Sequence, residues 1–145
     1  MRRVAIGLDY DGAAHHGWQS QPGGNTVQDH LEAALAKIAG EPIRVVCAGR
    51  TDRGVHALVQ VAHFDTASPR PLSAWVRGAN AHLPSSIAVR WAVHPAGDFH
   101  ARFNAVSRHY RYVLANQPVR PAVGFGKLGW YHVPLDEAAM QQAAC

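Results

Sequence analysis

The sequence contains little cysteine and no long apolar run, and each shortage excludes a class of protein. Cys47 and Cys145 are its two cysteines, too few for a disulfide framework or a cysteine-based metal site. This cysteine content fits a reducing, cytosolic setting. No apolar run is long enough to cross a membrane, and the run within residues 1–9 is too short for a signal peptide. We therefore expect a protein without a membrane segment.

Motifs for metals and cofactors are also missing. The ten histidines are scattered without the spacing of metal ligands, and no zinc signature occurs. A glycine-rich phosphate loop, a dinucleotide fingerprint and a nucleophile elbow are absent as well. The sequence thus predicts neither a metal nor a cofactor. An alternative remains open, in which histidines act with Asp9, Asp11 or Asp52 in a metal-assisted hydrolase.

What the chain has in excess is arginine. Lys37 and Lys127 are the lysines among 14 basic residues, which face 10 acidic ones and give a net charge of +4. The planar guanidinium group suits phosphate recognition and stacking better than an ammonium group does. This composition favours a nucleic-acid partner, although GC-rich coding would also enrich arginine. A length of 145 residues and 48% apolar content predict one folded domain.

Hydrophobic periodicity predicts an α+β fold. Apolar residues alternate in the predicted strands, and in the strand at residues 87–93 the side chains of Ile87, Val89, Trp91 and Val93 are expected on one face. Thr26 and Asp29 form a capping-box-like helix start, and Gly40 ends that helix. The predicted strands cover residues 3–10, 43–49, 55–64, 87–93, 106–115 and 129–133, and the predicted helices cover 26–40 and 73–81. This β-α-β-β-α-β order is that of a ferredoxin-like fold, with a mixed, mainly antiparallel sheet and helices on one face.

Asp52 is the candidate catalytic residue. It lies in a short polar segment between two predicted strands, with Arg50 and Arg53 beside it and a glycine at each end of the segment. A loop braced by strands exposes its side chains while the scaffold fixes them, so it is a favoured place for chemistry. The alternative is an ordinary surface turn with a solvated ion pair.

Residues 98–112 form a second candidate site. They contain Arg102, Arg108 and Arg111 together with four aromatic residues, after a single acid at Asp98. On a strand beginning at Val106, the side chains of Arg108, Tyr110 and Tyr112 would share one face. Aromatic rings beside guanidinium groups suit stacking on unpaired bases. Alternatively, both tyrosines belong to the core and Arg108 lies at its rim.

Several ordered motifs resemble one enzyme family. The segment Ala48-Gly49-Arg50-Thr51-Asp52-Arg53-Gly54-Val55-His56-Ala57 is similar to the active-site motif of the TruA-type tRNA pseudouridine synthases. Other segments agree in the same order: Tyr10-Asp11-Gly12, Gly17-Trp18-Gln19, Asn80-Ala81-His82-Leu83-Pro84, Asp98-Phe99-His100-Ala101-Arg102-Phe103 and Arg108-His109-Tyr110-Arg111-Tyr112. Arg53 departs from the family, which more often has a small residue or a lysine there.

The resemblance implies isomerisation of uridine to pseudouridine in the anticodon arm of tRNA, at positions thirty-eight to forty. It implies Asp52 as the catalytic carboxylate, Tyr110 stacked on the flipped base and Arg50 in the vacated space. The residues expected to support the site or contact RNA are Arg53, His56, Arg102 and Arg108. A homodimer with tRNA as its partner is implied too. Residues 1–133 would form the N-terminal catalytic domain, and 134–145 would begin a helix leading into an absent second half. Without that half, a non-catalytic RNA-binding fragment is the alternative.

Overall fold

The computed structural model describes all 145 residues and divides into two compact units, Met1–Arg108 and His109–Cys145. No helix in it combines the length and the apolar character that crossing a membrane requires.

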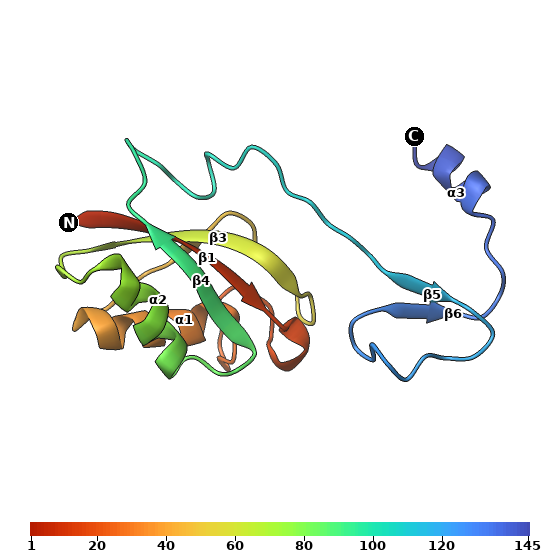
Figure 1. Ribbon diagram of the computed structural model, residues 1–145, viewed down its shortest axis with the longest axis horizontal. Helices are drawn as coiled ribbons and strands as arrows, with labels where there is room; N and C mark the ends of the chain where they lie inside the picture. The colour runs from red at the N-terminus through yellow and green to blue at the C-terminus, as the bar shows by residue number, and fades with distance from the viewer. The chain divides into compact units, whose positions relative to one another are not determined.

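The first unit is a four-stranded sheet with two helices on one face (Figure 1). Its elements, in chain order, are β1 (Arg2–Tyr10), the short 3-10 helix η1 (Gly12–Ala14), α1 (Val27–Ala39), β2 (Val46–Cys47), β3 (Ala57–Thr66), α2 (Leu72–His82) and β4 (Ile87–Val93). The strand order is β2-β3-β1-β4, and every pairing in this sheet is antiparallel. The predicted α+β, ferredoxin-like half-domain is confirmed.

Helix α1 begins and ends where the sequence predicts. The Thr26 side chain accepts a hydrogen bond from the backbone N–H of Asp29, and the Asp29 side chain accepts one from the backbone N–H of Thr26. Gly40 ends the helix with a φ of 73°, in the left-handed region that glycine adopts without strain. Val27, Leu31 and Leu35, at helical spacing, are buried against the sheet.

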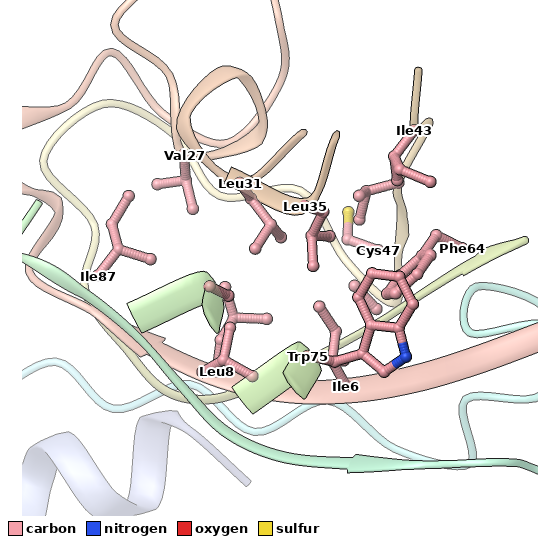
Figure 2. Close-up of a cluster of buried hydrophobic side chains, with 14 of the residues drawn as sticks. Ile6, Leu8, Val27, Leu31, Leu35, Ile43, Cys47, Phe64, Trp75 and Ile87 are labelled. Atoms are coloured by element: carbon pink, nitrogen blue, oxygen red, sulfur yellow. The ribbon is translucent and has the colours of Figure 1, made fainter. Parts of the chain in front are cut away.

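The hydrophobic core lies between the sheet and the two helices (Figure 2). Ile6 and Leu8 of β1 meet Leu31 of α1 there, and Trp75 of α2 packs edge-on against Phe64 of β3 with 5.1 Å between ring centroids. Burying an aliphatic or phenyl side chain of this size contributes about 1.5–3 kcal/mol. This core holds β1 and β3 rigid beneath the loops that follow them.

A β-bulge in β4 overturns one prediction. Val89 pairs with Leu8, yet Trp91 pairs with the adjacent Gly7, so Arg90 is an extra residue in β4. The extra residue reverses the alternation: Val89 faces the helices and is 1% exposed, whereas Trp91 lies over Gly7 on the other face and is 37% exposed. The prediction that Trp91 and Val93 share a face with Ile87 and Val89 was therefore wrong.

Two predicted strands are much shorter than expected. In place of the strand at 43–49 the structure has β2, and most of the expected strand at 106–115 is irregular chain ahead of β5 (Leu114–Asn116). In the second unit, β5 pairs in parallel with β6 (Gly129–Tyr131), and α3 (Glu137–Ala143) follows. Residues 106–113 belong to no strand ladder, and a strand needs a paired neighbour to fix which face each side chain takes. The shared face expected for Arg108, Tyr110 and Tyr112 is therefore absent.

Candidate active site

Asp52 lies at the start of a tight turn between β2 and β3. The backbone N–H of Val55 donates to the carbonyl oxygen of Asp52 over 3.1 Å, and Gly54 has a φ of 83°. The four residues 52–55 form a β-turn in which Arg53 is second and Gly54 third. A positive φ at the third residue alone is typical of a type II turn, which favours glycine at that position. Asp52 and Arg53 are both exposed. The turn thus presents a carboxylate and a guanidinium group to solvent.

Buried side chains hold the backbone on the N-terminal side of Asp52. The Thr51 hydroxyl lies 2.7 Å from that of Tyr10, and the Thr51 carbonyl oxygen accepts from the backbone N–H of Trp18 over 2.9 Å. Two residues earlier, the carbonyl oxygen of Gly49 accepts from the side-chain amide of Gln60 over 2.6 Å. The loop is therefore anchored both to β1 and to β3.

Two glycines of the Asp11–Asn25 loop pack directly against the Asp52 turn. A Cβ atom on Gly12 would lie 2.0 Å from the carbonyl oxygen of Val55, so the two backbones are in contact. A Cβ atom on Gly17 would lie 2.9 Å from the carbonyl oxygen of Thr51 and 3.2 Å from the backbone nitrogen of Arg53. The two backbones approach so closely at Gly12 and Gly17 that a side chain would not fit, and glycine is required at both positions.

Arg108 contributes a further anchor. Its Nε and Nη2 atoms donate to the carbonyl oxygen of Ala48 over 3.0 and 2.7 Å, and Nη2 also lies 3.2 Å from the carbonyl oxygen of Arg102. Four of the five carbonyl oxygens from residue 48 to residue 52 thus accept a hydrogen bond. The exposed Asp52 side chain stands on a backbone with little freedom to move.

Positive charge surrounds the start of this loop. Burial raises the pKa of the Cys47 thiol, and the charges of Arg50 and Arg102 oppose that rise. Both guanidinium groups therefore lie within electrostatic range of the end of β2. Arg50 and Arg102 are exposed, and the Arg102 guanidinium lies 6.0 Å from the ring centroid of Phe103. The arrangement suits contact with a polyanion.

His56 joins the turn to the loop after β1. Its Nδ1 atom lies 3.0 Å from the backbone nitrogen of Gly12 and 3.0 Å from an Asp11 carboxylate oxygen. Nδ1 accepts from Gly12 when it is unprotonated and donates to Asp11 when it carries a proton, so the two contacts belong to different tautomers or charge states. Either contact ties the C-terminal end of the turn to the loop that carries Gly12 and Gly17.

The segment that carries Arg102 is fastened to the face of the sheet opposite the helices. The backbone N–H of Ala101 donates to Nδ1 of His63 over 3.1 Å, and both residues are buried. His100 stacks on Phe103 with 4.2 Å between ring centroids. Arg3 donates to the carbonyl oxygen of Phe99 over 2.7 Å. These contacts fix residues 99–103 against β1 and β3 within the unit that bears Asp52.

The structure thus brings five of the predicted site residues to the Asp52 turn or its immediate contacts: Arg50, Asp52, Arg53, His56 and Arg108. Tyr110 belongs to the second unit, where it is 72% exposed. No group of three or more His, Cys, Asp or Glu residues is arranged to hold a metal ion.

Sequence reasoning missed the residues beneath the turn. Tyr10, Gly12 and Gly17 are noted above only as parts of the segments that match the family, and Gln60 lies without separate mention in the strand predicted at residues 55–64. The available signal was Gln60 itself, a polar side chain in the alternation that also contains Ala62 and Phe64. A buried amide needs hydrogen-bond partners, and here those partners are Gly49 in the Asp52 loop and Tyr10 in β1.

Sequence comparison assigns the chain to a family. The family model described as tRNA pseudouridine synthase matches residues 8–104, which include the Asp52 turn and all the glycine contacts beneath it. The chain belongs to the tRNA pseudouridine synthase family.

Individual relatives match nearly all of this chain. The tRNA pseudouridine synthase A of Dechloromonas aromatica is 62% identical over 141 residues, which are 97% of this chain and 54% of that protein. The protein of the same name from Aromatoleum aromaticum is 60% identical over 142 residues, 98% of this chain and 54% of that protein. The chain spans about half the length of the curated relatives it matches.

Proposed function

We propose that the full-length protein isomerises uridine to pseudouridine in tRNA and that Asp52 is its catalytic carboxylate. The observation that carries the proposal is the placement of Asp52, exposed on a turn whose backbone is fixed on both sides. Family membership supports the reaction class. The proposal concerns the full-length protein, because the chain spans about half of its relatives.

The reaction requires no oxidant or reductant. The N1–C1′ glycosidic bond breaks, the uracil turns, and C5 bonds to C1′; C5 then loses a proton and N1 gains one. Breaking the glycosidic bond develops positive charge at C1′, as in glycoside hydrolysis. A carboxylate placed close to C1′ stabilises that charge or bonds to the carbon. A preorganised group does this best, since it needs no rearrangement when the charge develops.

The target uridine must leave its base stack to reach Asp52. We assign stacking on the flipped base to the exposed ring of Tyr110. We assign to Arg50 the role of filling the space that the flipped base leaves in the RNA stack. Arg53 and Arg102 are exposed and would contact RNA phosphates, so affinity should fall with salt. Arg108 and His56 are engaged with protein groups, which favours a supporting role for both.

The finer assignments rest on the resemblance alone. We propose that the enzyme modifies positions thirty-eight to forty in the anticodon arm of tRNA. We also propose that it is a homodimer and that it is located in the cytoplasm. No step of the proposed reaction uses a metal or cofactor. The rival function is RNA binding without catalysis by the 145-residue chain, since relatives of nearly twice its length supply further residues.

Replacement of Asp52 tests the proposal. In the full-length protein, Asp52→Ala and Asp52→Asn should abolish release of tritium from uracil C5 of labelled tRNA while tRNA binding persists. Glu137→Gln, a change at an exposed acid of α3 outside both candidate sites, is the control and should keep wild-type turnover. Turnover by either Asp52 variant would remove Asp52 from the chemistry.

Two further assays test the alternatives. Assay of the 145-residue chain beside the full-length protein separates catalysis from binding alone, and insensitivity of turnover to a chelator would count against the metal-dependent alternative.

A further inference from the structure

A buried chain of hydrogen bonds connects the sheet to the Asp52 turn. Gln60 on β3 and Tyr10 at the end of β1 are 7% and 4% exposed. The Gln60 amide nitrogen lies 3.4 Å from the Tyr10 hydroxyl oxygen, and that oxygen lies 2.7 Å from the Thr51 hydroxyl. The same amide nitrogen also donates to the Gly49 carbonyl oxygen. The chain therefore ends at the two residues that flank Arg50, one of them directly before Asp52.

The hydrogen bonds have a consistent direction. The Gln60 amide carries two hydrogens, one for Gly49 and one for Tyr10. When the Tyr10 hydroxyl accepts from Gln60, its own hydrogen is available to Thr51. Hydrogen bonds arranged in this way polarise one another, and in a buried setting each is harder to break than an isolated exposed one. The Thr51 peptide is then held by its side chain and by the bond from Trp18 to its carbonyl oxygen.

We propose that Tyr10 is a positioning residue for catalysis: its hydroxyl, oriented by Gln60, fixes Thr51 and thereby the carboxylate of Asp52. The inference rests on the proposed function. The Tyr10 ring packs in the core beside Trp18, with 6.1 Å between centroids. The ring therefore contributes to folding stability, whereas the hydroxyl holds the Asp52 turn in place. A misplacement of about 1 Å at a reacting group can cost roughly 10²-fold in rate.

The test separates the hydroxyl from the ring. In the full-length protein, Tyr10→Phe and Thr51→Val each remove one end of the same bond and should lower kcat by roughly 10-fold or more, with the KM for tRNA within about 2-fold of wild type. Thr51→Ser keeps a hydroxyl and should restore most of the kcat. Both changes break the bond between Tyr10 and Thr51, and Tyr10→Phe also breaks the bond from Gln60, so the Tyr10→Phe/Thr51→Val double variant should be no slower than the slower single variant.

Thr66→Val is the matched control. Thr66 is also a buried residue of β3, but its hydroxyl bonds to Glu41 at the far end of the strand from Gln60. Thr66→Val removes the hydrogen bond to Glu41 and the one that Thr66 accepts from the backbone N–H of Ser68, and it should do so without a loss of kcat. Wild-type kcat in Tyr10→Phe, an equal loss in Thr66→Val, or additive losses in the double variant would overturn the proposal.

Two further results keep the outcome decisive. If Tyr10→Phe does not fold, the comparison of Thr51→Val with Thr51→Ser tests the proposal instead. Equal kcat values in these two variants would show that the Thr51 hydroxyl has no role in positioning Asp52. If Asp52→Ala is inactive and Tyr10→Phe is fully active, positioning by Tyr10 fails while the proposed function stands. Turnover by Asp52→Ala would instead overturn the proposed function itself.

Discussion

Gly17 packs against the carbonyl oxygen of Thr51, with its own backbone in the left-handed region at a φ of 81°. A side chain at this position would meet two difficulties. The conformation itself is unfavourable for a non-glycine residue by about 1–2 kcal/mol, and a Cβ atom would lie 2.9 Å from the Thr51 oxygen. To relieve the second difficulty, the Thr51 peptide would have to shift, and with it the turn that presents Asp52.

We therefore expect Gly17→Ala to reduce turnover more than its effect on stability would suggest. Gly40 is the matched control: it has a similar φ of 73°, with no atom near the position of a Cβ. Gly40→Ala should cost a comparable amount of stability and leave kcat unchanged. Urea unfolding and the C5-tritium release assay measure the two effects. Equal turnover in the two variants would show that the contact of Gly17 with the turn has no influence on catalysis.

Tyr110 should act through its ring. Tyr110→Phe keeps the aromatic face and should retain most activity, whereas Tyr110→Ala should lose the stacking, worth about 1–3 kcal/mol per base. The measurement is kcat/KM with tRNA. Tyr112→Ala, at a neighbouring exposed tyrosine, is the control and should have a smaller effect. A loss in Tyr110→Phe as large as in Tyr110→Ala would shift the role from the ring to the hydroxyl.

The stability of the protein should fall as the pH is lowered from about 6.5 to about 4. Burial, reinforced by the positive charges of Arg3 and His100 and opposed by Asp65, lowers the pKa of His63 from 6.5 to about 4. Between these values the unfolded state binds a proton at His63 and the folded state does not. The stabilisation is thus fully present above pH 6.5 and declines below it, by at most about 1.4 kcal/mol per pH unit.

The His63→Asn variant tests this origin. The asparagine side-chain oxygen can accept the hydrogen bond that Ala101 donates to Nδ1 of His63, yet it does not titrate. Urea unfolding at a series of pH values should show a flatter dependence between pH 6.5 and pH 4 than in the wild-type protein. An unchanged pH dependence would assign the effect to other groups.

The capping box of α1 supplies a separate prediction about stability. Thr26→Ala removes the side-chain acceptor of the Asp29 backbone N–H and should cost about 1 kcal/mol. Thr26→Ser keeps the acceptor and should cost clearly less. Urea unfolding measures both variants. Equal losses would mean that burial of the Thr26 methyl group, rather than the cap, is responsible.

Local patterns predicted those parts of the fold that depend on nearby residues. The cap at Thr26, the stop at Gly40 and the apolar spacing of α1 are encoded within one segment, and all three were confirmed. The β4 bulge was missed because an extra residue at Arg90 is defined only by pairing with β1. Residues 106–113 alternate like a strand but have no neighbour in a ladder, so periodicity alone misassigned them.

The same distinction applies to the candidate site. The polar segment with Asp52 could be recognised from its flanking strands and its glycines. The groups that hold it, among them Gly12 against Val55 and Tyr10 against Thr51, are brought together by the sheet across some forty residues of chain. Nothing in the spacing of the sequence reveals such contacts, because they exist only once β1 lies beside β3.

The central place of β1 in the sheet has a consequence for biosynthesis. This strand leaves the ribosome before its two neighbours, β3 and β4, so both of its edges stay unpaired until residues 57–66 and then 87–93 have emerged. Pairing across such long separations is slow, and an exposed apolar strand invites association with other chains. The nascent polypeptide therefore completes the sheet beneath Asp52 only after β4, which ends at Val93, is outside the exit tunnel.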